Sequence, residues 1–171
     1  MIKRYLSKNT TYWGLRAQAI VEFAIVLPIL LVILVGILEF GRMIFIYSSV
    51  TNASRDAVRY ASAVGLGDNG YHKFNNCVEI KNRAVSSSYL LRPADVTVSI
   101  SYDHGPGSGS AYAVCDATSG EDADVVVTTG DRVLVTVAAQ YRPMVKLIPI
   151  GARTFTSSSY RTILGVVKLD P

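Results

Sequence analysis

AIVEFAIVLPILLVILVGIL, residues 19–38, is the stretch of sequence that decides how this chain is organised. A helix of about 20 residues is about 30 Å long, which matches the hydrocarbon core of a bilayer. Glu22 is the only charged residue in the run. The run therefore predicts one transmembrane helix, which we place at residues 18–40. Pro28 lies inside it, where a membrane helix tolerates proline, and predicts a kink or weak point.

The charge distribution predicts the orientation of this helix. Lys3, Arg4, Lys8 and Arg16 precede the apolar run, and residues 1–17 contain no acidic residue. The net charge of +4 therefore belongs to this basic leader, and the rest of the chain is neutral by count. The positive-inside rule places residues 1–17 in the cytoplasm and everything after the helix outside. The neutral remainder excludes a broad basic face, so no nucleic-acid partner is expected.

A cleavable secretory signal is the main alternative for the apolar run. Such a signal has a short apolar core that is followed closely by a cleavage site with two small residues. Here the run is longer, and Glu39, Phe40, Gly41 and Arg42 follow it directly. The first Ala-x-Ala sequence after the run, at residues 61–63, lies more than 20 residues beyond it. The pattern favours a retained membrane anchor.

The residues within and around the run form a more specific combination. It comprises Gln18, Val21-Glu22-Phe23, Leu27-Pro28, Gly36, Glu39-Phe40-Gly41, Asn52-Ala53, Arg55, Ala57, Arg59 and Tyr60. With the acid, the proline and the Glu-Phe-Gly tripeptide at this spacing, residues 16–61 resemble the N-terminal region of TadE-like proteins. These are pseudopilins, or minor pilins, of the tight-adherence (Flp) pilus secretion system.

The resemblance implies a processing site and a role for Glu22. A prepilin peptidase would cut between Ala17 and Gln18, although the family usually has glycine before the glutamine. Gln18 would become the new N-terminus, and the Glu22 carboxylate would pair with the N-terminus of a neighbouring subunit inside a low-dielectric bundle. A cut after Gly14 would move Glu22 out of this register. The simpler alternative is a Glu22 side chain that reaches toward the cytoplasmic headgroups.

The resemblance also implies the function and the partners. We expect a structural subunit of type IV-like pilus assembly, with no catalytic activity and no cofactor. Its partners would be a prepilin peptidase, other pilin and pseudopilin subunits, the membrane assembly platform and the lipid bilayer. The alternative is a single-pass, membrane-anchored binding or adhesion module. Tyr102, Tyr112 and Tyr141 would then form a surface cluster for recognition, although packing in the core and the sheet explains these tyrosines as well.

Helical spacing continues beyond the membrane, over residues 41–64. An apolar stripe consists of Phe40, Ile44, Tyr47, Val50, Ala57, Tyr60 and Val64. The stripe is expected to pack on the chain's own domain, and part of it could equally pack against neighbouring subunits. The glycine-rich residues 65–70 end the helix.

Residues 65–171 predict a small exported domain. A second helix is expected at residues 75–91, where Arg92-Pro93 stops it. Alternating apolar residues predict strands at 95–102 and 132–141, and a polar edge strand at 153–162. Shorter pieces near 111–114 and 125–128 are expected to pair with these. The prediction is an α+β fold, in which a long N-terminal helix lies on a small antiparallel sheet with a second helix.

Little in this domain indicates chemistry. Cys77 and Cys115 are candidates for a disulfide in an oxidising compartment, or else two unpaired core residues. No group of residues has the close spacing of metal ligands. His72 and His104 fall in glycine-rich loops and are expected to be solvated. The acidic run at 121–124 lacks the spaced oxygen ligands of a calcium loop and is expected to be a solvated turn.

Overall fold

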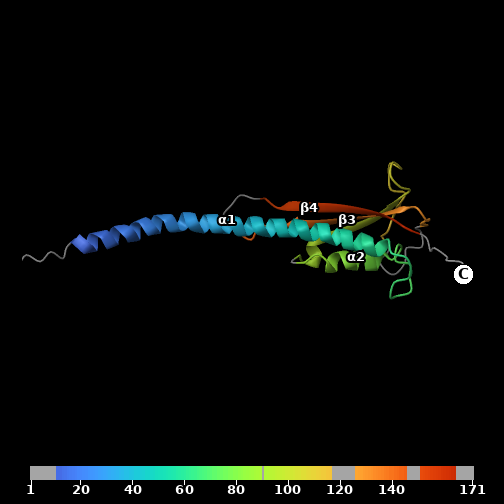
Figure 1. Cartoon of the computed structure of the whole chain (residues 1–171), viewed down its shortest axis with the longest axis horizontal. Coiled ribbons are helices and arrows are strands. Elements are labelled where there is room, and N and C mark those ends of the chain that lie inside the picture. The colour runs from blue at the N-terminus through green and yellow to red at the C-terminus, as the bar shows by residue number, and fades with distance from the viewer. Residues whose placement is uncertain (1–10, 90, 117–125, 146–150, 165–171) are drawn as a thin grey trace, which may run out of the picture.

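The computed structural model of the chain describes residues 11–89, 91–116, 126–145 and 151–164, with side chains from Gln18 onward. Helix α1 spans Thr11–Ala61 and α2 spans Cys77–Ser86, followed by a short 3₁₀ helix, η1, at Pro93–Asp95. Four strands follow: β1 (Val96–Asp103), β2 (Ala113–Val114), β3 (Arg132–Tyr141) and β4 (Arg153–Thr162). Figure 1 shows α1 as a long rod, with the sheet and α2 lying along its C-terminal half. The predicted α+β fold is confirmed. The acidic run at 121–124 and leader residues 1–10 lie outside the described residues.

Helix α1 is continuous from the leader, through the apolar run, into the domain. Pro28 lies inside the helix without interrupting it, and α1 is a single continuous rod in Figure 1. No residue of its most apolar window is buried by the described part of the chain, and its length and composition fit a single-pass membrane anchor. The helix ends at Ala61, three residues before the predicted end at Val64. Gly65 follows with φ +106°, a left-handed conformation that glycine adopts without strain.

The sheet is antiparallel throughout, with the strand order β2-β1-β3-β4. The alternation predicted for β1 and β3 is confirmed, because Ile100, Tyr102, Val133, Val135 and Val137 are all fully buried. The polar strand β4 lies at an edge, as expected. The prediction of a strand near residues 125–128 is wrong for residues 126–128. Both the backbone N–H and the hydroxyl of Thr128 donate to Asp131 Oδ2, so a turn forms there instead of a ladder.

Small side chains, together with the larger Ile46, Val50 and Val58, pack α1 into the core beside the sheet. Ala53, Ala57 and Ala61 are fully buried, and the Ser54 hydroxyl lies 3.1 Å from Ser157 Oγ and 3.0 Å from Ser159 Oγ of β4. The small residues let the helix approach the sheet closely. The predicted packing of the stripe on the domain is confirmed for Val50 and Ala57, which are buried, and Tyr60 is half-buried. It is wrong for Phe40, Ile44, Tyr47 and Val64, which are at least half exposed.

Helix α2 is shorter than predicted and is held at its start. The Asn76 side chain caps it by accepting a hydrogen bond from Glu79 N at 3.2 Å. Cys77, its first residue, forms a disulfide with Cys115, which follows β2, at a Cα–Cα distance of 5.6 Å.

The structure supports core packing for two of the three tyrosines and contradicts a surface cluster. Tyr102 is fully buried and Tyr141 is 1% exposed, whereas Tyr112 alone of the three is exposed. Each buried ring fills the core while its hydroxyl finds an internal acceptor: Tyr102 donates to the Phe74 carbonyl and Tyr141 to Glu39. This arrangement removes the main feature that favoured a recognition surface.

Candidate functional site

The most extensive uncovered apolar surface lies along α1. One line of residues on it follows helical spacing, with intervals of three or four positions, from the membrane run into the stalk. We call it the α1 stripe; it consists of Glu22, Val26, Ile29, Ile33, Ile37, Phe40, Ile44 and Tyr47. Glu22 is exposed and every apolar member exposes more than half of its surface. Glu22 and Phe40 are five full turns apart and so share one face of the helix. The stripe is a continuous surface on which another helix can pack.

Lipid alone does not account for the whole stripe. Tyr47 lies nine residues beyond Leu38, or about 13 Å along the helix axis. The headgroup layer extends only about 5–7 Å past the hydrocarbon core on each side. Tyr47 nevertheless remains 56% exposed, although its ring contacts Phe155 edge to face at 6.1 Å. The outer end of the stripe therefore faces water in the single chain.

Glu22 lies one helical turn from the predicted N-terminus of the processed chain. Its Oε1 accepts a hydrogen bond from Gln18 Nε2 at 3.0 Å, and both side chains are exposed. Ala17 and Gln18 are both within α1, so the predicted processing site lies on a helix in the unprocessed chain. This placement leaves the Glu22 carboxylate on the helix surface, where a group from another chain can reach it.

Glu39 has a different environment from Glu22. It is 6% exposed and packed against the end of β3. Its Oε2 accepts the Tyr141 hydroxyl at 2.6 Å, and its Oε1 accepts the N–H groups of Met144 at 2.8 Å and Val145 at 3.1 Å. Arg42 Nη1 lies 3.8 Å from Oε2 and donates to the Arg142 carbonyl at 2.9 Å. Glu39 therefore fastens the end of the sheet to α1.

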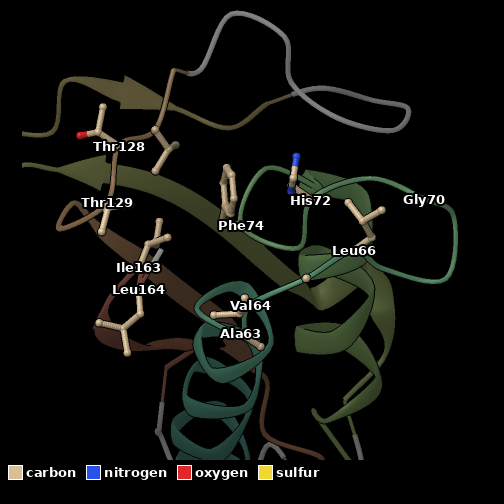
Figure 2. A pocket seen from close by; sticks show the side chains of 12 residues that line it. Ala63, Val64, Leu66, Gly70, His72, Phe74, Thr128, Thr129, Ile163 and Leu164 are labelled. Atoms are coloured by element: carbon tan, nitrogen blue, oxygen red, sulfur yellow. The ribbon is translucent and has the colours of Figure 1, made fainter. Parts of the chain in front are cut away.

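A pocket of about 590 Å³ lies at the other end of the domain. Figure 2 shows that its walls come from the end of α1, the loop after it, and the segments beside β3 and β4. Val64, Leu66, Phe74, Ile163 and Leu164 give it a largely apolar lining. His72 also lines the pocket, and its ring stacks on the Phe74 ring with 5.2 Å between the ring centroids. The pocket is therefore better suited to binding an apolar group than to catalysing a reaction.

Comparison with known proteins identifies the region that carries the α1 stripe. Residues 17–59 match the family model described as TadE-like protein. This segment is TadE-like. No curated protein and no solved structure matches the chain.

The TadE-like segment contains most of the predicted site residues. Gln18, Glu22, Pro28, Gly36, Glu39, Phe40 and Gly41 all lie within the match, and Ala17 is its first residue. The structure separates them into two groups. Glu22 and Phe40 belong to the exposed stripe, whereas Glu39 faces the domain. Cys77 and Cys115 lie outside the TadE-like segment, in the domain that follows it.

The domain after the TadE-like segment contains a polar cluster that the sequence did not indicate. Asp131 accepts the Tyr112 hydroxyl and the Thr128 hydroxyl, each at 2.9 Å, and the Thr128 N–H at 2.7 Å. His104 Nδ1 lies 2.9 Å from Asp131 Oδ1, and the His104 ring stacks on Tyr112 at 4.2 Å. The expectation that His104 is simply solvated is therefore incomplete, because these two contacts hold its side chain in place. Nearby, Arg132 donates two hydrogen bonds to the Asp103 carboxylate, at 2.6 and 2.7 Å.

Electrostatics in this cluster favour the ionised carboxylate. Burial raises the pKa of Asp131, but the hydrogen bonds from His104, Thr128 and Tyr112 outweigh it and lower the pKa to about 2. Burial and the same carboxylate raise the pKa of Tyr112 to about 12. Among the described residues, no group of three histidine, cysteine or acidic side chains lies close enough to hold a metal ion. The cluster is a structural support for the loops at this end of the sheet.

We predict that Asp131 makes the domain sensitive to acid. Its folded pKa lies below the ordinary carboxyl value, so between about pH 4 and pH 2 the unfolded chain binds more protons than the folded one. The stabilisation, about 1–2 kcal/mol, is present above pH 4 and lost as the pH falls toward 2. Denaturant titrations at each pH should show this loss. In Asp131→Asn the unfolding free energy should be lower at neutral pH and change less over this range. Equal slopes in both proteins would contradict the assignment.

Proposed function

We propose that the chain is a minor pilin or pseudopilin-type structural subunit in the assembly of a tight-adherence (Flp) pilus. The α1 stripe is the observation that supports this function most directly. It runs along a TadE-like helix from Glu22 in the membrane segment to Tyr47 in the stalk, and the chain's own domain leaves it uncovered. A helix that served only as an anchor would need an apolar surface in the membrane, but not beyond the headgroups.

In this function α1 acts twice. It first holds the subunit in the membrane, with residues 1–17 in the cytoplasm and the domain outside. It then packs through the stripe against the helices of other pilin and pseudopilin subunits, at the membrane assembly platform or in the filament. Interhelical packing of this kind relies on close van der Waals contact. No catalytic step by this chain is involved, because its role is assembly.

Proteolytic processing creates the positively charged group with which Glu22 pairs. A prepilin peptidase removes residues 1–17 and creates an α-amino group on Gln18. In an assembled bundle this positive group on one subunit meets the Glu22 carboxylate of its neighbour. The low dielectric inside the bundle strengthens the attraction, and the pairing sets the axial register between the two helices.

We predict that the mature protein begins at Gln18. Mass spectrometry of membrane fractions, with and without the prepilin peptidase, measures this directly. A large residue at the cut, as in Ala17→Trp, should leave the leader attached, whereas Ala17→Gly should be processed at least as well as the natural sequence. A Met1 start that does not depend on the peptidase would refute processing of this kind.

The distal pocket supports a second candidate, a membrane-anchored binding module. Its apolar lining, of which Phe74 and Ile163 are part, is of a size that holds a small ligand or peptide side chain (Figure 2). This function needs the helix only as an anchor. It predicts an intact leader and no effect of changes in the α1 stripe on complex formation.

A further inference from the structure

The end of β3 and the residues after it lie beside α1 at the level where the apolar run ends. Tyr141 at the end of β3 pairs with Arg153 at the start of β4, and β4 begins at the end of the domain nearest the N-terminal half of α1 (Figure 1). Two contacts fix this region to the helix. Glu39 Oε1 accepts the Met144 and Val145 N–H groups, and Arg42 Nη1 donates to the Arg142 carbonyl. We call residues 142–145 the membrane-proximal edge.

Helix geometry sets the depth of this edge. Residues 19–38 fill the hydrocarbon core, so Glu39 lies within about 2 Å of its boundary and Arg42 about 6 Å beyond it. The headgroup layer extends about 5–7 Å past the core. The membrane-proximal edge is held against Glu39 and Arg42, so it lies within the headgroup layer whenever α1 spans the bilayer.

The chemistry of the edge suits that layer. Met144 is 76% exposed and Val145 38% exposed, so each presents apolar surface that water covers in the single chain. The Arg142 side chain is 63% exposed and provides a cation beside them, although its Nη2 also lies 3.8 Å from Asp95 Oδ1. Apolar side chains next to a basic one are typical of segments that lie in a membrane interface.

The backbone of the edge is also prepared for a less polar environment. A free N–H group is costly to place near hydrocarbon because it loses its hydrogen bond to water. Glu39 accepts the N–H groups of both Met144 and Val145, at 2.8 and 3.1 Å. These hydrogen bonds do not depend on water, so the segment can enter the interface without leaving those donors unsatisfied.

We propose that the membrane-proximal edge inserts into the headgroup layer of the bilayer that α1 spans. The exported domain then has two attachments to the membrane: the helix itself, and Met144 and Val145 beside it. The strands lie along α1 (Figure 1), so the second attachment keeps the end of β3 at the headgroup layer and limits tilting of the domain relative to the membrane. The proposal rests on α1 spanning the bilayer and not on the pilin function. A second copy of the chain is the competing occupant of this surface.

Depth-dependent quenching tests the proposal on the full-length chain. Trp13 is the only tryptophan, so Trp13→Phe gives a background in which Met144→Trp reports from the edge. Met144 is mostly exposed and its contacts with Glu39 use the backbone, so the substitution leaves the fold intact. The protein is placed in nanodiscs at one copy per disc, with phosphatidylcholine and phosphatidylglycerol brominated near the glycerol end of the acyl chain. Leu66→Trp, 54% exposed in its native form and at the distal end, is the matched control.

We expect brominated lipid to reduce Met144→Trp emission about twofold and to leave Leu66→Trp unchanged, because only the edge lies in the headgroup layer. Arg142→Gln should weaken the quenching more in anionic than in zwitterionic discs. Water-like, unquenched emission of Met144→Trp at one copy per disc would overturn the proposal. A blue shift that appears only at two or more copies per disc, without quenching by bromine, would assign the surface to a second copy instead and would equally overturn it.

Discussion

Glu22→Gln is expected to abolish co-assembly of the subunit while leaving its insertion into the membrane intact. The substitution keeps the size and shape of the side chain but removes the charge that, in the proposed assembly, pairs with the N-terminus of a neighbour. Breaking a buried ion pair by removing one partner costs about 3–5 kcal/mol, which is at least a hundredfold in an association constant. Glu22→Asp keeps the charge on a shorter side chain and should lose less.

Glu22→Gln should reduce co-assembly but maintain or increase membrane integration. These opposite effects distinguish loss of the pairing from a general loss of folding. In an isolated subunit an unpaired carboxylate in the apolar run is unfavourable, so its removal should maintain or increase the membrane-integrated amount. Cross-linking or co-purification with partner pilin subunits measures assembly, and carbonate extraction measures integration. Both are carried out on the processed protein, because the pairing needs the α-amino group of Gln18.

Glu79→Gln is the matched control for Glu22→Gln. Glu79 is also a helical glutamate with a partner four residues away, since its Oε1 lies 3.3 Å from Arg83 Nε. It belongs to α2, away from the α1 stripe, and an exposed pair of this kind contributes little. We expect it to leave assembly unchanged. If Glu22→Gln assembled as well as Glu79→Gln, the pairing role of Glu22 would be refuted.

The regular elements of the domain could be predicted from the sequence, because alternation and helical spacing report directly on burial. β3 and β4 begin and end at the predicted residues, Arg132–Tyr141 and Arg153–Thr162. In both, each second side chain points to the helix-covered face, and turn-forming or glycine-containing segments precede them. The TadE-like pattern could be predicted as well, because its acid, proline and Glu-Phe-Gly tripeptide lie at fixed spacing along one helix.

The side of α1 that meets the domain could not be predicted, because hydrophobicity does not identify the partner of an apolar surface. Large residues such as Phe40 and Ile44 suggest burial, but they are exposed in the single chain. The actual contact includes Ala53, Ser54 and Ala57, whose small size permits close approach, beside the buried side chains of Ile46 and Val50. The Asp131 cluster was missed for a related reason. Its members come from three separate segments, and only the folded chain brings them together.

The two glutamates in the TadE-like segment are another case in which the sequence alone does not predict what a side chain contacts. Glu22 and Glu39 each interrupt or end the apolar run, and the sequence associates both with the membrane helix. The structure distinguishes them by burial, because Glu22 is exposed and Glu39 is 6% exposed. Substitution should therefore affect different properties of the protein: assembly for Glu22, and attachment of the domain to α1 for Glu39.

Glu39→Ala is expected to lower the free energy of unfolding of the domain by about 3–5 kcal/mol. The change leaves two backbone N–H groups and the Tyr141 hydroxyl without the carboxylate that accepts them, in a place that water reaches poorly. Each unsatisfied buried donor costs about 1–3 kcal/mol. The end of β3 should then separate from α1, and limited proteolysis should cut first near Met144 and Val145.

Two further variants divide this effect among the contacts of Glu39. Tyr141→Phe removes only the hydroxyl donor to Oε2 and should cost about 1 kcal/mol, typical of one hydrogen bond. Glu39→Gln keeps an acceptor oxygen for the backbone N–H groups and should fall between Tyr141→Phe and Glu39→Ala. Glu79→Ala, at an exposed position on α2, should change the unfolding free energy by less than about 0.5 kcal/mol.

Denaturant unfolding of the full-length protein in detergent, followed by the loss of sheet signal in circular dichroism, measures all four variants. The order Glu39→Ala, Glu39→Gln, Tyr141→Phe, Glu79→Ala, from the most to the least destabilised, is the expected result. Integration into the membrane should stay the same throughout, since the apolar run is unchanged. If Glu39→Ala were no less stable than Glu79→Ala, Glu39 would not fasten the sheet to α1. The depth of the membrane-proximal edge would then lose its structural basis, because the Met144 and Val145 N–H groups would have no fixed position along the helix.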